Sequence, residues 1–402
     1  MNKDLSQLQR YPFEKLAELK QGLQPPAELD HIALSIGEPR HPAPHFVTEN
    51  LIAHLHQLSI YPSTRGQQAL REAIADWLTS RFSIPPGQID PESNVLPVSG
   101  TRESLFAIAQ CVVDRSAANP LLLMPNPFYQ IYEGAALLAG ASPRYLDCLP
   151  ENDFLPDLDA VPDSEWADCQ LIYICNPGNP TGAVMSRAYL QKLIELAHRY
   201  DFVIASDECY SEIYFDEDDP PAGLLGTAAE MGNESFSHCL AFHSLSKRSS
   251  LPGLRSGFVA GDAELLRSFL LYRTYHGCAM PPATQTASTA AWRDEAHVIE
   301  NRELYRQKFE QVLQLLSDTL APRKPQAGFY LWAQTPISDT EFARRLYAEQ
   351  NVTVLPGRYL ARDSAAGNPG LNRVRMALVA PLDECLDAAR RINSLIAVLE
   401  EK

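Results

Sequence analysis

The middle of the chain alternates short apolar runs with segments whose apolar residues recur at helical spacing. Runs this short, with no polar alternation, are typical of strands that are buried on both faces. Six runs carry the pattern: Val95–Val98, Leu121–Met124, Leu171–Cys175, Phe202–Ala205, Leu240–His243 and Gly257–Ala260.

Helical patterns separate these runs. Between the third and fourth runs, Ser186 precedes RAYLQKLIELAHRY, where apolar residues recur every three or four positions behind a suitable serine cap. A similar pattern follows the first run, from Leu105 to Val113. Strand, helix and strand at this spacing predict an α/β fold with a mainly parallel central sheet flanked by helices and right-handed crossovers.

The two ends of the chain have a different pattern. Residues 1–30 form a polar, proline-containing arm with a short helix, and a long helical pattern starts near Asp294. A strand at Gly328–Trp332, a helix near Glu341–Gln350 and a strand at Val374–Leu378 follow. Because 402 residues exceed what one core usually organises, we expect a large domain over 46–293 and a smaller α+β domain. Residues 294–402 form this smaller domain, together with part of the arm at 1–45.

Composition excludes several classes of partner. The chain has 34 Lys and Arg against 50 Asp and Glu, a net charge of −16. This acidity argues against duplex nucleic acid and against anionic membranes, and no run of about 18 apolar residues predicts a membrane span. The first residues lack the apolar core of a signal peptide. The sequence therefore predicts a cytoplasmic protein.

Metal and disulfide chemistry are not predicted either. The eight cysteines are scattered with no C-x-x-C pair, which favours a reduced protein without a zinc ribbon. The pairs His41/His45 and His54/His56 resemble metal pairs only in spacing, and without H-E-x-x-H or nearby cysteines we interpret them as solvated or helix-surface histidines. No metal site is expected.

Four polar motifs directly follow predicted strands. They are Ser99-Gly100-Thr101, Asn176-Pro-Gly-Asn179-Pro-Thr-Gly182, Asp207-Glu208-Cys-Tyr210 and Ser244-Leu-Ser246-Lys247. Because ligands of open α/β sheets gather at the carboxyl ends of strands, we expect the four motifs to form one site.

Each motif has a plain structural interpretation beside its chemical one. Gly100 and Thr101 begin a helix, whose free N–H groups favour a phosphate, but they are also an ordinary helix start. Asp207, after an apolar strand, needs a cation or hydrogen-bond donors, and a protonated ring nitrogen or a structural salt bridge satisfies that need. Lys247, beside Arg248 and near Arg255, is either a surface lysine or a nucleophilic amine whose pKa is lowered by desolvation and neighbouring cations.

Taken together, SGT, NPGNPTG, SDECY and SLSKRSSLPGLR closely resemble the class I/II aminotransferases, enzymes of fold type I that use pyridoxal phosphate (PLP). The resemblance runs from Gly37-Glu-Pro to Arg375, almost the whole chain. It implies a large domain with a mainly parallel sheet, a smaller α+β domain, and ping-pong transfer of an amino group between amino acids and 2-oxo acids.

The resemblance also implies roles for individual residues. Lys247 matches the catalytic lysine that forms the Schiff base, and Asp207 the acid that pairs with the pyridine N–H. Asn179 and Tyr210 match the groups that hydrogen-bond the cofactor's 3-oxygen. Tyr129 matches the aromatic ring that stacks on the cofactor, with Phe128 as the alternative. The phosphate cradle corresponds to Gly100, Thr101, Ser244, Ser246 and Arg255.

Three further residues have implied roles. Arg375, with Arg373 as its neighbour and competitor, matches the arginine that binds the substrate α-carboxylate bidentately, and Gly37 matches a backbone contact to the same group. Tyr61 resembles a tyrosine that reaches the phosphate of the neighbouring subunit, which implies a homodimer with two shared sites.

The substrate is less strongly constrained. YPFEKLAEL, IALSIGEPRHPAP and LSKRSSLPGLRSGFVAGD are similar to segments of bacterial N-succinyldiaminopimelate aminotransferases of lysine biosynthesis, which use glutamate and N-succinyl-2-amino-6-oxopimelate. Aspartate, alanine and aromatic aminotransferases, and PLP-dependent C–S lyases, share the same cofactor motifs and stay open as alternatives. A related transcriptional regulator is not expected, since no room for a winged-helix module precedes Gly37. Candidates for a distal carboxylate contact are Arg40, Arg65, Arg102, Arg248 and Arg273.

Overall fold

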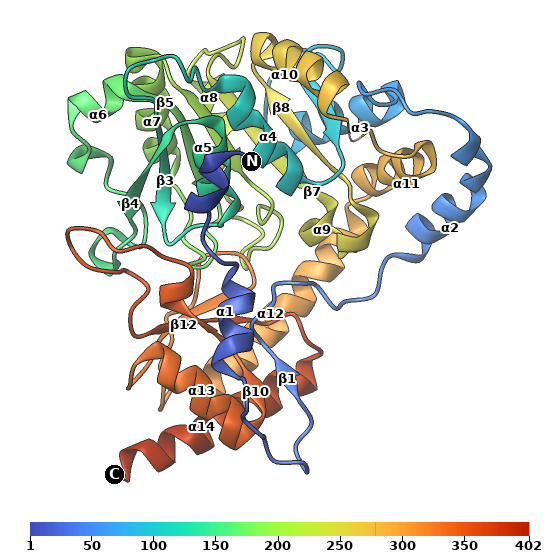
Figure 1. Cartoon of the computed structure of the whole chain (residues 1–402). Helices are drawn as coiled ribbons and strands as arrows, with labels where there is room; N and C mark the ends of the chain where they lie inside the picture. Colours follow the sequence, from blue (N-terminus) through green and yellow to red (C-terminus); the bar gives the residue numbers. More distant parts are fainter. Residues whose placement is uncertain (278, 402) are drawn as a thin grey trace.

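A seven-stranded sheet forms the core of the larger part of the molecule (Figure 1). The computed structural model describes residues 1–277 and 279–401, so Cys278 lies outside the described residues. The strand order is β2-β8-β7-β6-β5-β3-β4. The strands are β2 (Val95–Val98), β3 (Leu121–Asn126), β4 (Ser142–Asp147), β5 (Cys169–Cys175), β6 (Val203–Asp207), β7 (Cys239–Ser244) and β8 (Gly257–Gly261).

Strand direction brings the strand ends of interest to one edge. Strands β4, β3, β5, β6 and β7 are mutually parallel, whereas β8 is antiparallel to both β7 and β2. Strand β2 therefore points the same way as β7, and the carboxyl ends of β2, β5, β6 and β7 lie at one edge. The mainly parallel α/β sheet predicted from the sequence is confirmed.

Alternate residues of the central strands enter two separate cores. Ile172 and Ile174 of β5 pack in one core with α7, while Leu171 and Tyr173 pack in the other with α4 and α5. Since both faces are covered, both alternating sets must be apolar, which explains the continuous apolar runs. The helices in this part are α2 (His45–Ala53), α3 (Gln68–Arg81), α4 (Thr101–Val112), α5 (Ile131–Ala139), α6 (Asp163–Asp168), α7 (Arg187–Tyr200), α8 (Leu224–Glu230), α9 (Leu245–Arg248), α10 (Ala263–His276) and α11 (Pro282–Arg293).

The sequence patterns identified all but one strand of this sheet. Helix α7 also begins where predicted, with the Ser186 hydroxyl accepting a hydrogen bond from the Tyr189 N–H at 3.2 Å. The strand that was not predicted is β4, whose sequence SPRYLD is polar and only partly buried. It lies at the edge of the sheet, where a continuous apolar run is not required.

A smaller part of the molecule joins the two ends of the chain (Figure 1). The first strand, β1 (Ile32–Ala33), pairs in parallel with β10 (Val352–Thr353). A second sheet has the order β11-β12-β9 and consists of β9 (Tyr330–Gln334), β11 (Leu355–Pro356) and β12 (Arg373–Ala377). The helices are α1 (Pro12–Leu19), α12 (Ala296–Leu316), α13 (Asp339–Gln350) and α14 (Leu382–Glu400). The domain limits at residues 45 and 293 stay predictions.

The short 3-10 turns complete the described structure. They are η1 (Lys3–Gln7), η2 (Leu55–Ser59), η3 (Pro150–Asn152), η4 (Leu158–Ala160), η5 (Pro252–Leu254) and η6 (Gly357–Tyr359). Across the described residues, no helix combines the length and apolar character needed to span a membrane.

The buried face of α7 offers a test of this packing. Leu193 is fully buried, whereas Glu195 on the same helix is exposed. Leu193→Ala should lower the free energy of unfolding by about 2–5 kcal/mol, because it leaves a cavity in the core. Thermal unfolding followed by circular dichroism measures the effect, with Glu195→Ala as the matched control. Equal midpoints for the two variants would contradict the burial of Leu193 in this core.

Candidate active site

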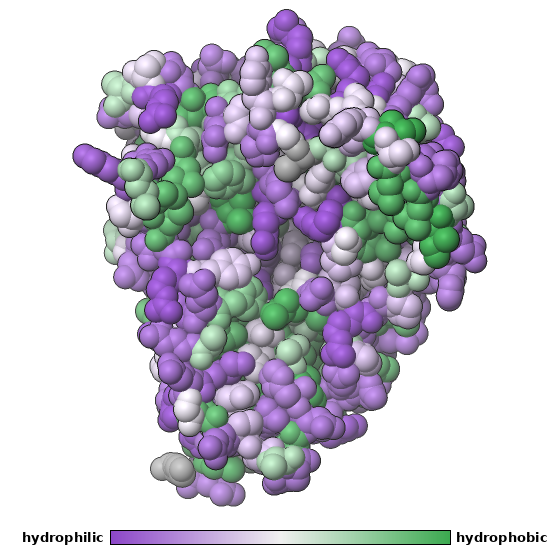
Figure 2. Space-filling model, turned by 45° about the vertical axis from the view of Figure 1, so that its right-hand side comes forward, coloured by the Kyte–Doolittle hydropathy of each residue, from purple (hydrophilic) through white to green (hydrophobic). Residues whose placement is uncertain are grey.

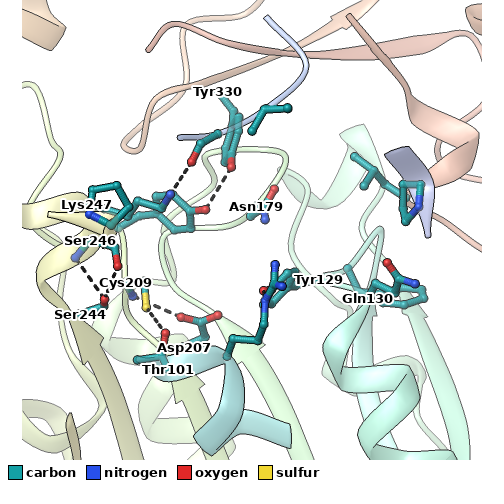
Figure 3. A pocket seen from close by; sticks show the side chains of 18 of the residues that line it. Thr101, Tyr129, Gln130, Asn179, Asp207, Cys209, Ser244, Ser246, Lys247 and Tyr330 are labelled. Atoms are coloured by element: carbon teal, nitrogen blue, oxygen red, sulfur yellow. Dashed lines mark hydrogen bonds between the residues drawn. The ribbon is translucent and has the colours of Figure 1, made fainter. Parts of the chain in front are cut away.

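A cavity of about 420 Å³ opens where the carboxyl edge of the large sheet meets the smaller part of the molecule. Residues from all four polar motifs line it, and so do residues of the smaller part (Figure 3). Of the predicted site residues, the cavity wall includes Gly37, Thr101, Tyr129, Asn179, Asp207, Tyr210, Ser244, Ser246, Lys247, Arg255 and Arg375. The expected convergence of the motifs on one site is therefore observed.

Lys247 lies in the short helix α9, directly after β7. Its ammonium group donates a hydrogen bond to the Gly37 carbonyl and lies 5.2 Å from the centre of the Phe329 ring. Desolvation, together with the charge of Arg375, lowers the pKa of Lys247 to about 8. The amine is therefore nucleophilic at a much lower pH than an exposed lysine.

Asp207 is a buried carboxylate at the end of β6. It accepts hydrogen bonds from the Tyr132 hydroxyl at 2.8 Å and from the Cys209 N–H at 3.3 Å. Within the described residues, no cationic side chain forms an ion pair with Asp207, and desolvation raises its pKa above the ordinary value. A buried carboxylate with neutral donors alone is suited to a ligand that brings its own protonated nitrogen.

The start of α4 and the β7–α9 turn form a pocket for an anion. Gly100 precedes the helix with φ = 92°, and a Cβ there would lie 2.2 Å from Nη2 of Arg255. Only glycine fits this approach. The hydroxyl of Ser244 donates to that of Ser246 at 2.9 Å, and both face the cavity together with the start of α4 (Figure 3). Free N–H groups at the start of a helix, hydroxyls and a guanidinium are suited to bind a phosphate.

Arg375 of β12 lies on another wall of the cavity. Its guanidinium donates to the Asn179 Oδ1 at 3.0 Å and to the Ser35 carbonyl at 2.8 Å, and it lies 4.5 Å from the centre of the Tyr330 ring. The buried Nε has no hydrogen-bond partner among the described residues. Since no carboxylate pairs with Arg375 in the described structure, its charge is available to an anionic ligand.

Neighbouring groups orient the amide of Asn179 and the hydroxyl of Tyr210. Arg375 donates a hydrogen bond to the oxygen of the Asn179 amide. The amide nitrogen therefore points into the cavity, as Figure 3 shows. The Tyr210 hydroxyl lies 3.1 Å from that of Tyr330. A Cβ on Gly37 would lie 2.0 Å from the same Tyr330 hydroxyl, which explains why residue 37 is glycine.

The two aromatic candidates differ in their surroundings. Phe128 is buried and stacks on Tyr145, with ring centres 5.5 Å apart. Tyr129 is half-buried, and its hydroxyl accepts a hydrogen bond from Arg102 at 2.8 Å. These contacts favour Tyr129 as the ring that faces a bound cofactor. Arg373, the competitor of Arg375, lies 5.1 Å from the Phe154 ring and does not line the cavity.

Of the five candidate distal arginines, Arg102 alone lines the cavity. The other four have partners elsewhere: Arg40 bonds Glu384, Arg65 bonds the Glu92 carbonyl, Arg248 bonds Glu295 and Arg273 bonds the Pro97 carbonyl. Tyr61 is fully exposed and does not line the cavity of its own chain, so its role stays a prediction that requires a second subunit.

Three residues that contribute to the site were missed by sequence reasoning. Tyr132 bonds Asp207, Tyr330 contacts Arg375 and Tyr210, and Cys209 lies 3.1 Å from the Thr101 hydroxyl. Only Cys209 carried a signal, since it lies inside the SDECY motif. Tyr132 and Tyr330 lie in segments whose pattern indicates ordinary core residues.

The interpretation of His41 as a solvated histidine was wrong. His41 is half-buried, with Nδ1 2.7 Å from the Asn301 Oδ1 and Nε2 2.6 Å from the Lys308 Nζ. Both partners lie on α12, more than 250 positions along the chain, and therefore left no local signal. No group of three or more candidate metal ligands occurs in the described part of the chain.

Comparison with known proteins agrees with this geometry. The family model "Aminotransferase class I and II" matches residues 30–392. The chain belongs to the class I and II aminotransferases. Enzymes of this family depend on PLP, and members act on amino acids and 2-oxo acids.

Individual relatives are similar over nearly the whole chain. An LL-diaminopimelate aminotransferase of Nitratidesulfovibrio vulgaris is 32% identical over 376 residues, covering 91% of this chain and 92% of the relative. The crystal structure of an aminotransferase from Neisseria meningitidis is 48% identical with a TM-score of 0.94, covering 98% of this chain and all of the other. A probable N-succinyldiaminopimelate aminotransferase from Thermus thermophilus is 27% identical with a TM-score of 0.81, covering 95% and 99%.

The residues of this aminotransferase fit PLP at each end of the cavity. Thr101, Ser244, Ser246 and Arg255 line the cavity and carry donors for a phosphate. Gly100 does not line it, and its N–H donates to the Val98 carbonyl at 2.8 Å, but the glycine leaves the space that a side chain would fill. Asp207 lacks a cation, which a protonated pyridine nitrogen supplies. The assignment of these residues, and of Lys247 as the Schiff-base lysine, is the prediction that the geometry supports.

The lowered pKa of Lys247 gives a test that does not depend on turnover. In cofactor-free protein, the rate of condensation with added PLP should rise with pH through about 8 and then level off, because only the neutral amine attacks the aldehyde. An ordinary lysine keeps gaining rate up to its pKa of about 10.4. Stopped-flow absorbance measures the rate. Lys247→Ala should abolish both this reaction and amino transfer, and retention of either in that variant would overturn the assignment.

Proposed function

We propose that this aminotransferase transfers an amino group between glutamate and N-succinyl-2-amino-6-oxopimelate, with 2-oxoglutarate and N-succinyl-LL-2,6-diaminopimelate as products. Each of these substrates carries one carboxylate beside the reacting carbon and at least one more distant from it. A site for them therefore requires two separate anion contacts. The proposed reaction belongs to lysine and diaminopimelate biosynthesis.

The observation that carries this proposal is the position of Arg102. It lies on the Tyr129 side of the cavity, where its guanidinium donates to the Tyr129 hydroxyl at 2.8 Å and to the Tyr11 hydroxyl at 3.3 Å. Arg375 lies on the Asn179 and Tyr330 side. Arg102 forms no ion pair with a carboxylate in the described structure: its hydrogen-bond partners are the two tyrosine hydroxyls, and the neighbouring Glu103 pairs with Arg255. Arg102 lies in the first turn of α4, where the positive end of the helix dipole disfavours a cation. Arg102 is therefore not there to stabilise the helix, which supports a role in binding.

In the proposed reaction, different residues around the cavity bind the substrate and transfer the proton. Bound PLP supplies the electron sink that stabilises negative charge at the substrate Cα. Arg375 and the Gly37 backbone hold the α-carboxylate and so fix the Cα–H bond relative to the cofactor ring. The Lys247 amine, once free, takes the proton from Cα and later returns one, as its lowered pKa permits. The two substrates bind in turn at the same site, which is ping-pong kinetics.

The names of the relatives favour a second candidate of the same substrate class. The 30–32% identical curated relatives from Nitratidesulfovibrio vulgaris and Maridesulfovibrio salexigens are called LL-diaminopimelate aminotransferases. Free LL-diaminopimelate lacks the succinyl group but keeps a carboxylate at each end. The geometry around Arg102 and Arg375 is compatible with both substrates.

A panel of donors and acceptors with purified, PLP-loaded protein separates these functions. We expect the highest kcat/KM for N-succinyl-LL-2,6-diaminopimelate with 2-oxoglutarate, followed by LL-diaminopimelate. A preference for LL-diaminopimelate would establish the second candidate. A preference for aspartate, alanine or an aromatic donor would reject both, and release of pyruvate and ammonia from a cysteine conjugate would identify a C–S lyase.

Replacement of Arg102 tests the second anion contact directly. Arg102→Met should lower kcat/KM for dicarboxylic substrates about 10- to 100-fold, because one charge-assisted interaction is lost. Alanine, which has no distal carboxylate, should be affected much less. Arg65→Met is the matched control, since Arg65 bonds the Glu92 carbonyl away from the cavity. Equal losses for alanine and glutamate in Arg102→Met would exclude a role in substrate selection.

We further propose a homodimer in which Tyr61 completes the site of the partner. The segment from α2 to Tyr61 exposes Ile52, Leu55, Leu58, Ile60 and Tyr61, all between 45% and 100% accessible. Figure 2 shows apolar surface on the upper right, the side where Figure 1 places α2. Apolar patches of this kind are typical of interfaces, and a second copy of the chain is the occupant that the role of Tyr61 requires.

The described cysteines are free thiols, which supports the proposal of a reduced, cytoplasmic location.

A charge placed in this surface tests the dimer. Leu58 is 66% exposed, so Leu58→Asp should not disturb the folded monomer, but it would place a carboxylate in the interface. We expect a shift from dimer to monomer in sedimentation velocity and a lower affinity for PLP. Val398→Asp at the far end of α14 is the control, since that side chain is 39% exposed. A variant at Leu58 that sediments like the parent protein would contradict this interface.

A further inference from the structure

A chain of hydrogen bonds leads from a buried lysine on α12 to the backbone of Lys247. Lys308 is only 3% exposed, and its ammonium contacts the Nε2 of His41 at 2.6 Å and the Val379 carbonyl at 3.4 Å. The Nδ1 of His41 lies 2.7 Å from the Asn301 Oδ1. The amide nitrogen of Asn301 then donates to the carbonyls of Lys247 and Arg248, each at 3.1 Å.

The bonding pattern fixes the direction of every hydrogen bond in this chain. Carbonyl groups only accept, so Asn301 must present its NH₂ group to α9 and its oxygen to His41. His41 must therefore carry its proton on Nδ1, and its bare Nε2 accepts from Lys308. Protonation of His41 would set two donors against each other. Consistently, burial and the nearby Lys308 charge lower the pKa of His41 to about 4, although the Asn301 hydrogen bond opposes this.

The three side chains connect segments that carry separate parts of the site. Helix α9 has four residues, so its last carbonyls have no partner within the helix, and Asn301 supplies one. His41 lies four positions after Gly37, in the loop whose carbonyl accepts from Lys247. Val379 lies four positions after Arg375, in the turn between β12 and α14. One connected group thus bonds the Lys247 backbone directly and reaches the loop that follows Gly37 and the turn that follows Arg375.

We propose that His41 and Asn301 form a positioning relay that holds the Lys247 backbone in register with the Gly37 loop, and that Lys308 serves to orient the His41 ring. This proposal rests on the proposed role of Lys247, and none of the three residues lines the cavity. Their action on the reaction is through the placement of the Lys247 amine.

Burial of Lys308 is difficult to explain as a source of stability. No carboxylate lies within ion-pair distance of its ammonium in the described structure, and burial lowers its pKa to about 8. A buried cation without a counter-ion is destabilising relative to an apolar residue of similar size. Its ammonium lies 5.1 Å from the Tyr305 ring centre, and that ring packs against His41 at 4.6 Å. The polar group therefore costs stability while it specifies the orientation of the His41 ring.

Two conservative substitutions at His41 distinguish the effect of its hydrogen bond to Asn301 from the effect of side-chain size. An asparagine amide nitrogen occupies roughly the place of Nδ1 of histidine, whereas a glutamine amide nitrogen occupies roughly that of Nε2. His41→Asn therefore keeps the bond to Asn301, and His41→Gln loses it. We expect kcat to fall about 10-fold or more in His41→Gln and in Asn301→Leu, because the lysine amine is displaced from its reactive position. KM should change by less than about threefold, and His41→Asn should restore most of kcat.

A spectroscopic measurement reports on the same displacement without turnover. The visible circular dichroism band of bound PLP depends on how Lys247 and its surroundings orient the ring. We expect this band to change in Asn301→Leu and His41→Gln and to be kept in His41→Asn. The matched control is Asn393→Leu, because Asn393 donates to the Leu315 carbonyl at the end of α12 and accepts from Thr319, away from the cavity. It should lower thermal stability to a similar extent but leave the band and kcat unchanged.

The outcomes distinguish this inference from the proposed function. Equal effects of His41→Asn and His41→Gln on kcat, or an unchanged band in Asn301→Leu, would overturn the relay. If Asn393→Leu lowered kcat as much as Asn301→Leu, general destabilisation would be the cause and the relay would again be rejected. If the unmodified protein had no visible band that depends on Lys247, the role of Lys247 itself would fail, before any relay variant is measured.

Discussion

The parallel alignment of strands in the large sheet is the constraint on which the site depends. Strands β2, β5, β6 and β7 end at one edge, so polar residues far apart in the sequence meet within one cavity. Neighbouring strands are about 4.8 Å apart, and Asp207 pairs in register with Phe242 of β7, two residues before Ser244. The antiparallel strand β8 begins at this same edge, which brings Arg255, two residues before it, to the start of α4.

Desolvation at this edge gives the polar groups their reactivity. Asp207 and Lys247 both lie where water is largely excluded. Burial raises the pKa of Asp207 and lowers the pKa of Lys247, so in each case the neutral form is favoured. PLP, with a cationic ring nitrogen and an anionic phosphate, would supply the partners that these groups lack. The net charge of −16 gives no hint of this, because the cations Arg102, Arg255 and Arg375 gather around the cavity while most acidic residues lie elsewhere. Net charge describes the outer surface, and the site has its own local field.

The sequence was most informative where one element determines a residue's environment. The central strands were predictable because burial on both faces requires apolar residues at every position, and the motif residues were predictable because they follow those strands directly. Edge strand β4 was not, since a strand with a solvated face and few neighbours tolerates the sequence SPRYLD. Arg102 could not be separated from Arg40 or Arg65 by sequence, because the difference lies in tertiary partners. His41 was misinterpreted for the same reason, since its two partners belong to α12.

The two ends of the chain bring Gly37 and Arg375, the residues proposed to bind the substrate carboxylate, into one unit. Strand β1 pairs with β10, the Ala377 N–H donates to the Leu34 carbonyl at 2.7 Å, and Arg375 donates to the Ser35 carbonyl. Gly37 and Arg375 therefore belong to one hydrogen-bonded assembly, whereas Asp207 and the phosphate cradle belong to the large sheet. In the proposed reaction, a carboxylate bound by Arg375 and a cofactor bound at the sheet edge would meet at Lys247, whose ammonium donates to the Gly37 carbonyl. The Lys247 carbonyl also accepts from Asn301 of α12, so this one residue at the edge of the large sheet has hydrogen bonds to two residues of the smaller part. If Lys247 acts as proposed, the relative placement of the two parts at this residue would set how the Cα–H bond is oriented for proton transfer.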